Sequence, residues 1–406
     1  MANQRKILLI GDNHPEMLAI AENLARRKID FTILLPVFFM DSEMEILKRL
    51  PKLSKHALKR QVPNQIQSRQ VIRPLFILEL IIWYSKQRGF NNSARVLTKI
   101  SEQMYKFYLF IRIKISRPTL VITYDTFFVK KNNFKLIVIC PAIHPNSHRK
   151  YIENAQKKAE GWPEKFHSLL SEAKIETIND ADKLIVLSKF AAQSYLENGI
   201  LEHLIEIIHI GPKNFLKGLN ENNRRNERDG KKLEVIFLGR LTLSKGIKDI
   251  LEASWKLSDQ FSFSLVGNCA DGLFEYLKSK SNSANLRIYR GADHKKISEL
   301  IASANVMLHP SYFEGFSIAC IEGLRNGLIP IFSTNSGVAE ILRGSDFEKL
   351  IIHPGDIQSI VTKLEYVASL DGKKLNELSY WAKEISRDYS FENFSNSLVN
   401  HVLRIN

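Results

Sequence analysis

The feature that most constrains the fold is a repeated order of short apolar runs and longer periodic segments. Parallel strands covered on both faces read as short apolar runs, and the crossover helices between them read as amphipathic segments. The first half of the chain holds six such runs, at residues 6–10, 31–35, 119–123, 135–140, 183–187 and 205–210. The second half holds six more, at residues 234–238, 262–266, 286–289, 306–309, 329–332 and 350–352. The sequence therefore predicts two α/β domains, each built on a doubly wound parallel sheet.

A polar segment separates the two series. Residues 212–232 are rich in Asn, Arg and Glu, which is typical of an exposed connection between domains. A chain of 406 residues also exceeds what one hydrophobic core usually serves. We therefore predict a first domain at 1–211 and a second at 233–385. Residues 386–406 are expected to form a helix that packs back on the first domain.

Positive charge is concentrated in one segment of the first domain. The net charge is +15, and residues 42–117, expected to be mostly helical, hold 16 Lys and Arg against 4 Asp and Glu. Aromatic and cationic side chains interleave between Tyr105 and Lys114, which suits an anionic membrane surface. A solvated helix face over a buried aromatic stripe would give the same pattern, so both interpretations stay open. No nucleic-acid recognition motif accompanies the charge, so nucleic acid is not expected as a partner.

Several features favour a cytoplasmic location. The apolar run after residues 1–6 is too short for the core of a signal peptide, and the longest apolar stretch, 75–84, is about half a membrane span and includes Glu79. The three cysteines are widely spaced and form no CxxC pair, so neither a disulfide framework nor a zinc site is expected. We expect a cytoplasmic protein that associates with the inner face of the membrane at most peripherally.

Two cations follow the first predicted strand of the second domain. In the stretch 234–247 a strand is predicted to end at Gly239 and a helix to start after Gly246, which leaves Arg240 and Lys245 in the loop between them. Cations beside the free N–H groups of a helix N-terminus suit a diphosphate. Neither half has a GxGxxG turn after its first strand, which argues against a dinucleotide-dependent oxidoreductase.

A second stretch, 309–324, brings two carboxylates near a helix N-terminus. Glu314 follows a predicted strand, and Gly315 permits close approach of the backbone. The helix that begins near Ser317 offers free N–H groups to an anion, and Glu322 lies about one and a half turns into it. Carboxylates on either side of amide donors suit a ligand that carries both hydroxyl and phosphate groups.

These stretches, GRLTLSKGIKDILEA and HPSYFEGFSIACIEGLRNGLIPIFSTNSGVAEIL, resemble those of the family 4 glycosyltransferases. That family has the GT-B fold, two Rossmann-like domains facing a cleft, and retains the anomeric configuration. The likeness is strongest over 234–342, with weaker similarity at 182–188 and 207–212. It implies a hexosyltransferase-like enzyme that moves a sugar from a nucleoside-diphosphate sugar to a glycan or lipid-linked acceptor. Synthesis of a cell-surface polysaccharide or glycolipid would be its setting.

The resemblance also implies roles for single residues. Arg240 and Lys245 would bind the donor diphosphate and stabilise it as it leaves, Glu322 would hold the ribose hydroxyls, and Glu314 would contact the donor sugar. With His144, which matches a family histidine near the sugar hydroxyls, Glu314, Arg240 and Lys245 form the expected catalytic set. Further donor contacts are expected at Gly267, Asn268, Arg290, Gly291, Gly315, Phe316 and Ser317.

The acceptor side is expected on loops that follow strands of the first half. The candidates for acceptor binding are Asp12, His14, Asp125, His144 and His148. No metal and no cofactor is expected, because fixed cations can stabilise the leaving diphosphate. The one Asp-x-Asp tripeptide, residues 180–182, immediately precedes a predicted strand and reads as a structural turn.

Two alternatives use the same donor site. A sugar-nucleotide epimerase or hydrolase of GT-B shape would need no carbohydrate acceptor, whereas the basic segment favours transfer. A noncatalytic module that binds a nucleotide sugar or a membrane is suggested by the loop at 11–14, which keeps one glycine where the family has a glycine-rich loop. The retained cations and carboxylates of the second half favour catalysis.

Overall fold

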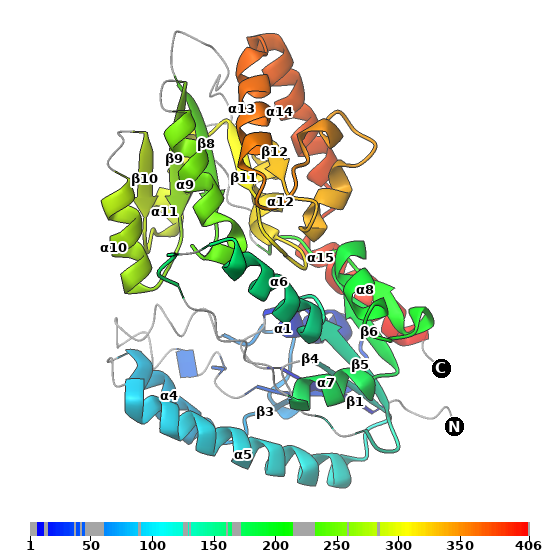
Figure 1. The fold of residues 1–406 in the computed structure, drawn as a ribbon. Coiled ribbons are helices and arrows are strands. Elements are labelled where there is room, and N and C mark those ends of the chain that lie inside the picture. The colour runs from blue at the N-terminus through cyan, green and yellow to red at the C-terminus, as the bar shows by residue number, and fades with distance from the viewer. Residues whose placement is uncertain are drawn as a thin grey trace. The chain divides into compact units, whose positions relative to one another are not determined.

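A computed structural model gives the fold of most of the chain (Figure 1). It describes residues 6–11, 15–35, 38–40, 43–44, 61–87, 91–124, 129, 131–159, 161–164, 172–213, 232–257, 260–281 and 285–404. Three expected acceptor-binding residues, Asp12, His14 and Asp125, lie outside these ranges. Most of the expected linker at 212–232 and part of the basic segment also lie outside them.

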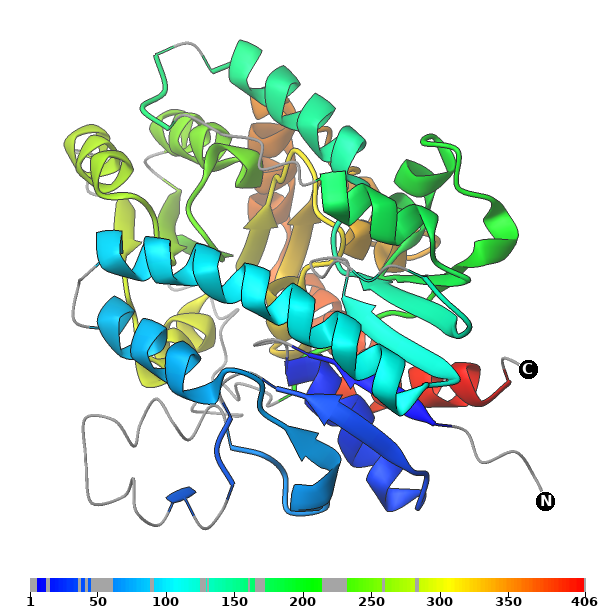
Figure 2. The ribbon, with the colours of Figure 1, turned by 90° about the horizontal axis from the view of Figure 1, so that it is seen from below.

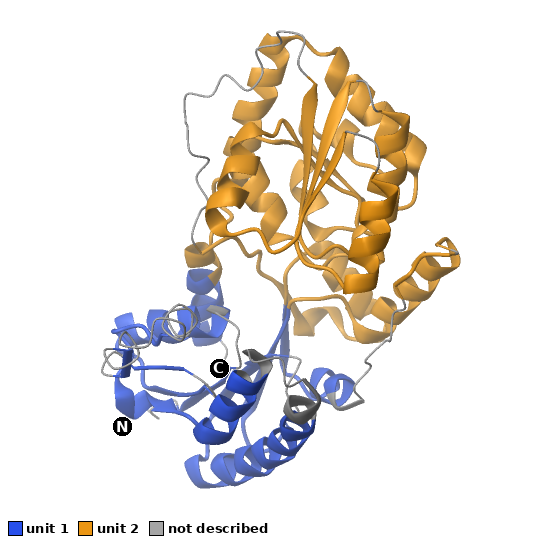
Figure 3. Ribbon diagram, turned by 90° about the vertical axis from the view of Figure 1, so that its left-hand side faces the viewer, with its two compact units in different colours: residues 1–140, 171–185, 395–406 blue, residues 141–170, 186–394 orange. Residues whose placement is uncertain are grey.

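The chain divides into two compact units (Figure 3). Unit 1 comprises Met1–Cys140, Ser171–Ile185 and Ser395–Asn406. Unit 2 comprises Pro141–Leu170 and Val186–Phe394. Each unit is therefore assembled from segments that are far apart in the sequence. Unit 2 includes residues that precede the polar segment in which the sequence analysis set the domain boundary.

The first sheet has seven strands in the order β3-β2-β1-β4-β5-β6-β7. They are β1 (Ile7–Ile10), β2 (Phe31–Leu34), β3 (Val71–Ile72), β4 (Leu120–Tyr124), β5 (Lys135–Cys140), β6 (Lys183–Val186) and β7 (Ile205–Ile207). The inner strand β1 pairs in parallel with both β2 and β4, so the strand order reverses beside it. All of β1 and β4 is buried, which explains why both read as uninterrupted apolar runs.

Helices connect these strands, as the alternating pattern predicts. They are α1 (Pro15–Arg26), α4 (Phe76–Gln87), α5 (Asn91–Ser116), α6 (Pro145–Lys157), α7 (Glu172–Asn179) and α8 (Lys189–Leu196). The structure describes α4 and α5 within the basic segment, which the sequence predicts to be helical. It also places β3 there, a strand that the sequence analysis did not predict because two residues are too few to show an alternation.

The second sheet has five parallel strands in the order β10-β9-β8-β11-β12. They are β8 (Leu233–Leu238), β9 (Phe261–Val266), β10 (Leu286–Tyr289), β11 (Val306–His309) and β12 (Ile329–Phe332). The strand predicted at 350–352 is wrong. Glu348–Leu350 is a 3-10 helix, and Ile352 makes an isolated bridge to Ser333. Leu350 and Ile352 are buried in the core although they form no strand, so an apolar run here does not indicate one.

The helices of the second half are α9 (Ile247–Lys256), α10 (Asp271–Lys280), α11 (His294–Ser303), α12 (Ile318–Arg325), α13 (Ile357–Ser369), α14 (Gly372–Ser386) and α15 (Phe391–Arg404). Every residue of β9, β11 and β12 is buried, as expected for strands covered on both faces. The predicted class, two parallel α/β sheets, is confirmed. Within the described residues, no helix is long and apolar enough to cross a bilayer.

Candidate functional site

A glycine lets the loop after β8 lie against the loop after β11. The loop turns through the 3-10 helix Leu243–Lys245 and reaches α9 at Gly246, whose φ of 75° is unfavourable for other residues. A Cβ atom on Gly246 would also overlap the carbonyl oxygen of Pro310. The two stretches singled out in the sequence therefore meet at this point, although they are more than sixty residues apart.

Lys245 and Glu314 form an ion pair across this junction. Burial lowers the pKa of Lys245 to about 8, and the nearby Arg240 guanidinium acts in the same direction. The adjacent carboxylate favours the protonated lysine, so the ammonium is the main form at neutral pH. The structure thus brings together one cation and one carboxylate of the expected catalytic set.

The main chain holds Glu314 in place. Its N–H donates to Asn335 O at 2.9 Å, and its carbonyl oxygen accepts from the N–H of Gly337 at 2.9 Å. These bonds make a parallel bridge between Glu314 and Ser336. The carboxylate is therefore presented from a fixed backbone beyond the end of β11 rather than from a loose loop.

Three main-chain donors follow Glu314. Among the described residues, no hydrogen bond uses the N–H of Gly315, Phe316 or Ser317, which lead into the N-terminus of α12. The other side of this segment is fixed, because Gly315 O accepts from the Ser188 hydroxyl at 2.6 Å. Successive N–H groups at a helix N-terminus form a binding site for an anion.

The Phe316 side chain has a packing role. Its ring is buried, and its centroid lies 5.5 Å from that of His209 and 6.1 Å from that of Tyr389. The His209 ring in turn pairs with Glu340 at 2.5 Å. A contact of Phe316 with a ligand would therefore involve its main chain.

His309, which the sequence analysis did not select, contacts Ser317, one of the three residues whose N–H groups are unused. The imidazole is fully buried and stacks on Phe237, with ring centroids 5.3 Å apart. Its Nδ1 lies 3.0 Å from the Ser311 hydroxyl and its Nε2 lies 3.5 Å from that of Ser317. Burial, with a contribution from Lys245, lowers the pKa of His309 to about 3, so the ring is neutral. Its place at the end of an apolar run was the only signal in the sequence.

Glu322 is a mostly buried carboxyl group on α12. Its neighbours in the chain, Cys320, Ile321 and Leu324, are buried, and burial raises the pKa of Glu322 to about 7. Burial is the one cause of this shift, so within the described residues no hydrogen-bond donor or charge stabilises the carboxylate. A desolvated carboxylate of this kind suits the hydroxyl donors of a ligand.

Arg240 lies exposed in the loop after β8, with Glu164 near it. Glu164 Oε2 accepts a hydrogen bond from Leu243 N at 2.7 Å. Burial raises the pKa of the Glu164 carboxyl, although the Leu243 N–H and Arg240 oppose the shift. The sequence analysis missed Glu164, because no motif links it to a loop almost eighty residues away. The loop expected to bind a diphosphate thus already holds an anionic group of the protein.

Gly267 and Asn268 adjoin the same loop. A Cβ atom on Gly267 would overlap Gly239 O, so the ends of β8 and β9 approach more closely than any side chain would allow. The carbonyl oxygen of Asn268 accepts from Leu241 N at 2.9 Å. Both expected residues therefore lie beside the Arg240 loop, and Asn268 helps to shape it through its backbone.

Arg290 and Gly291 have different surroundings. Arg290 Nη2 lies 2.5 Å from Asp271 Oδ1, and its guanidinium lies 5.3 Å from the Phe274 ring centroid, so it is engaged with α10. Gly291 is exposed, with a φ of 69° and open space where a side chain would be. Within the described residues no ion pair or hydrogen bond joins either residue to the Lys245 and Glu314 pair.

His144 is buried and caps a helix. Its Nδ1 accepts from Asn146 N at 3.3 Å at the start of α6, and its own N–H donates to the Ser194 hydroxyl at 2.9 Å. Its ring packs edge-on against Tyr195, with centroids 5.3 Å apart. This local role is common for a histidine beside a proline, and the spacing in the sequence does not distinguish it from a ligand contact.

His148, one turn further along α6, packs against the site. Its ring centroid lies 4.7 Å from that of Phe313, the residue before Glu314. A Cβ atom on Gly315 would overlap Pro141 O, so the segment that leads into α6 also touches this loop. Both histidines and the Lys245 and Glu314 pair therefore belong to unit 2.

The Asp-x-Asp tripeptide is engaged within unit 1. Asp182 Oδ2 accepts from Leu136 N at 2.8 Å, and its Oδ1 pairs with Lys131 Nζ at 2.7 Å. Asp180 Oδ2 accepts from Lys131 N at 3.4 Å. These bonds fit the interpretation of the tripeptide as a turn. No group of three or more His, Cys, Asp or Glu residues that could hold a metal occurs among the described residues.

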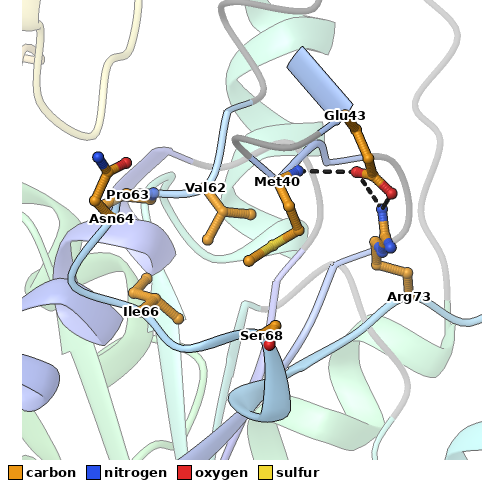
Figure 4. A pocket seen from close by; sticks show the side chains of 8 residues that line it. All are labelled: Met40, Glu43, Val62, Pro63, Asn64, Ile66, Ser68 and Arg73. Atoms are coloured by element: carbon orange, nitrogen blue, oxygen red, sulfur yellow. Dashed lines mark hydrogen bonds and ion pairs between the residues drawn. The ribbon is translucent and has the colours of Figure 1, made fainter. Parts of the chain in front are cut away.

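Unit 1 contains a separate pocket of about 360 Å³ (Figure 4). It is lined by Met40, Glu43, Val62, Pro63, Asn64, Ile66, Ser68 and Arg73. Arg73 Nη1 lies 2.7 Å from both carboxylate oxygens of Glu43, so the charges at this pocket already neutralise each other. None of the expected acceptor-binding residues lines it.

Comparison with known sequences finds similarity that includes the second half of the chain. Residues 220–385 match the family model of the glycosyl transferases group 1. The chain is 25% identical over 272 residues to a 2-deoxystreptamine N-acetyl-D-glucosaminyltransferase of Niallia circulans, covering 60% of this chain and 69% of that one. It is 27% identical over 176 residues to the N,N'-diacetylbacillosaminyl-diphospho-undecaprenol alpha-1,3-N-acetylgalactosaminyltransferase of Campylobacter jejuni, covering 40% and 45%. An uncharacterized glycosyltransferase of Methanocaldococcus jannaschii is 25% identical over 170 residues, covering 41% of this chain and 43% of that one.

Solved structures match the whole chain. Sucrose-phosphate synthase from Thermosynechococcus elongatus has a TM-score of 0.64 at 14% identity and covers 99% of both chains. Anabaena HepE in complex with UDP and glucose has a TM-score of 0.59 at 14% identity, covering 99% of this chain and 100% of that one. These matches show the GT-B fold with two Rossmann-like units, as predicted. Over residues 220–385, this chain is similar to the group 1 glycosyl transferases.

Proposed function

We propose that the protein transfers a sugar from a nucleoside-diphosphate sugar to a glycan or lipid-linked acceptor, with retention of the anomeric configuration. One observation carries the proposal: in unit 2, Lys245 pairs with Glu314, and the next three residues along the chain, 315–317, have unused N–H groups. Cations and amide donors favour the diphosphate, and carboxylates favour sugar hydroxyls. HepE was solved with UDP, and the Campylobacter jejuni relative is named for an undecaprenol-linked acceptor, which supports both substrate classes.

The ion pair between Lys245 and Glu314 would exchange partners when the donor binds. The diphosphate would replace Glu314 beside Lys245, and the carboxylate would then accept hydrogen bonds from the sugar hydroxyls. Arg240 and the N–H groups that follow Glu314 would add further donors to the phosphates. Because these groups are fixed before the reaction, they stabilise charge that develops on the leaving group.

Glu322 would bind the ribose of the donor. Two hydroxyl donors would satisfy the buried carboxylate and favour its ionised form, which has no partner among the described residues. Gly267 and Asn268 lie beside the same loop, so they are proposed to line the path of the diphosphate and base, as are Arg290 and Gly291. The last two would need the guanidinium to leave the Asp271 carboxylate.

The reaction breaks the bond between the anomeric carbon and the diphosphate oxygen, and the electron pair leaves with the diphosphate. The acceptor oxygen forms the new bond and loses its proton to the departing diphosphate or to solvent. Lys245 and Arg240 would stabilise the departing anion, so the chemistry proposed for these residues needs no metal ion. Transfer that persists in excess EDTA is the expected result.

The remaining assignments depend on the family resemblance. His144 is proposed to contact the sugar hydroxyls, although its Nδ1 now caps α6. We propose that the acceptor contacts Asp12, His14, Asp125 and His148. These residues follow predicted strands of the first half, where acceptor-binding loops are expected. No contact of the described residues tests these roles.

A screen followed by an assay tests the proposal. Nucleotide sugars are first screened for thermal stabilisation of the full chain, since a bound donor raises stability by mass action. The best donor is then assayed for transfer with and without lipid-linked or glycan acceptors. We expect turnover that depends on the acceptor. Complete conversion of the donor without any acceptor would instead indicate an epimerase or hydrolase.

Matched lysine variants sharpen this test. Lys245→Ala should reduce kcat/KM by about a hundredfold to a thousandfold, because a fixed cation at the leaving group is lost. Lys248→Ala, three residues along the chain, removes a lysine that pairs with Glu252 on α9 and should change kcat/KM less than threefold. Equal turnover in wild type and Lys245→Ala would contradict the assigned role.

A further inference from the structure

The long helix α5 has a buried face and an exposed apolar face. Ser101, Tyr105 and Leu109 recur every fourth residue and are buried. A second set of apolar side chains, the exposed stripe, is 39% to 69% exposed and consists of Val96, Ile100, Met104, Phe107, Ile111 and Ile115. Because these positions are three or four residues apart, they lie along one side of the helix. Large apolar side chains gathered in this way mark an interaction surface.

The neighbouring helix α4 extends this surface. Ile77, Ile81 and Tyr84 are exposed and follow the same spacing of four and three. The two helices pack against each other, and the Ser101 hydroxyl bonds to the Glu79 carboxylate between them. Figure 2 shows α4 and α5 side by side, on the side of the molecule nearest to the viewer. Two adjacent helices thus leave apolar side chains uncovered.

Cations accompany the apolar side chains. Residues 76–117 contain eight Lys and Arg but only two Glu. Lys99, Lys106 and Lys114 are exposed, and Lys114 Nζ lies 4.3 Å from the Phe110 ring centroid. The lysine stems can therefore lie along apolar surface while the ammonium groups reach polar surroundings.

Charge and apolarity together select the partner. A second copy of this chain seated on the same face would bring like-charged lysines together, which opposes self-association. A nucleic acid would satisfy the lysines but not the isoleucines, valine and phenylalanine. The interfacial layer of a bilayer with anionic phospholipids offers phosphates and acyl chains at adjacent depths. Since α5 does not qualify as a membrane span, it would lie along the surface rather than cross it.

We propose that α4 and α5 bind the surface of an anionic phospholipid bilayer. The exposed stripe inserts among the upper acyl segments, and Lys99, Lys106 and Lys114 contact lipid phosphates. This binding does not depend on the donor site, which is in unit 2, so it can be tested whether or not the proposed transfer occurs. It would bring the protein to acceptors that are held in a membrane.

Flotation of the full chain with lipid vesicles tests the proposal. One set of vesicles is phosphatidylcholine alone, and the other contains one third phosphatidylglycerol. We expect the protein to float with the anionic vesicles and to bind the neutral ones at least tenfold more weakly, because each cation near an anionic surface strengthens binding. Equal binding to both sets would overturn the proposal.

Apolar variants locate the contact. The double variant Phe107→Ser with Ile115→Ser should weaken binding to anionic vesicles by about tenfold or more, because two apolar side chains that would insert into the bilayer are lost. Leu201→Ser is the matched control, since Leu201 is 59% exposed but lies outside α4 and α5. A loss of the same size in Leu201→Ser would contradict the assignment. All these positions are exposed, so unchanged thermal unfolding is expected and checks the fold.

Charge variants separate lipid binding from self-association. Replacement of Lys99, Lys106 and Lys114 by Gln should weaken binding to anionic vesicles by roughly a hundredfold, at about fivefold per lysine. Sedimentation of the wild type and of the apolar and charge variants without lipid tests whether a second copy of the chain covers the exposed stripe instead. If the wild type is a dimer that the Phe107→Ser and Ile115→Ser changes dissociate, a second copy covers the stripe and the proposal fails.

Discussion

Lys245 and Glu322 have pKa values displaced towards neutrality from opposite directions. Burial lowers the pKa of Lys245 to about 8 and raises that of Glu322 to about 7. The lysine loses its proton above its pKa, and the glutamate loses its charge below its own. Since the proposed donor contacts use the charged form of both, they coexist over a narrow range of pH.

We therefore expect kcat/KM for the donor to be bell-shaped, with a maximum between pH 7 and 8 and limbs approaching a tenfold change per pH unit. Lys245→Arg keeps a cation that does not titrate in this range, so the alkaline limb should disappear or move up. Glu322→Gln should remove the acid limb. Steady-state kinetics between pH 5 and 10 measures both effects. An alkaline limb left in place in Lys245→Arg would assign it to another group.

The negative charge of Glu164 is expected to weaken binding of the donor. Its carboxylate lies near Arg240, at the loop proposed to hold the diphosphate. Glu164→Gln keeps an acceptor for Leu243 N–H but removes the negative charge that competes with the donor. We expect donor affinity to rise about fivefold, the effect of about 1 kcal/mol. Calorimetric titration of the donor measures it. Glu299→Gln, at a surface pair on α11, is the control and should leave affinity unchanged.

Between elements, Tyr312 ties the loop after β11 to α9. Its hydroxyl donates to Asp249 Oδ1 at 3.3 Å, and its N–H donates to Ser244 O at 2.8 Å. Asp249 is buried, and burial raises its pKa to about 6. A buried carboxylate with few donors makes this hydrogen bond more valuable than a surface one.

Tyr312→Phe should therefore lower the free energy of unfolding by about 1–3 kcal/mol at pH 8, because Asp249 loses a donor. The penalty should shrink at pH 5, below the pKa of about 6, where a protonated carboxyl is easier to bury. Urea unfolding at the two pH values measures the difference. Tyr380→Phe, at an exposed tyrosine of α14, is the control. A loss in Tyr312→Phe that does not change with pH would show that Asp249 is not involved.

For helices and strands, the sequence predicted those elements that are long enough to show a periodic pattern. Apolar runs located the strands because parallel strands are buried on both faces, so their positions are local in the sequence. The strand β3 was missed because it is two residues long, and the run at 350–352 was misassigned because packing alone explains its burial. Both errors arise where the number of residues is too small for a period.

For the whole molecule, α15 joins the C-terminal end of the chain to unit 1. The Ser395 hydroxyl donates to Ala19 O at 3.0 Å, and Asn396 and Asn23 bond through their side chains at 2.5 Å. Leu398, Val399 and Val402 are fully buried. Residues almost four hundred positions apart therefore share one core, which makes that core dependent on the end of the chain.

Leu398→Ala should lower the free energy of unfolding by about 2–5 kcal/mol, through lost burial and the cavity that remains. Ser397→Ala changes an exposed neighbour and should stay within about 0.5 kcal/mol. Chemical unfolding of the full chain measures both. If the two variants lost similar stability, α15 would be dispensable for the core of unit 1.

The sequence by itself determined the α/β class, most of the strands and the two stretches in which we propose the donor site, because apolar periodicity and loop chemistry are local properties. Tertiary structure decided which partners those residues contact and how deeply they are buried. The pairing of Lys245 with Glu314, the approach of Glu164 to Leu243 N–H and the burial of His309 join segments brought together only by packing. The pKa values depend on burial and on nearby charges, and both follow from long-range contacts. The same contacts decide which face of α5 is buried and which is exposed, and a local sequence pattern does not show them.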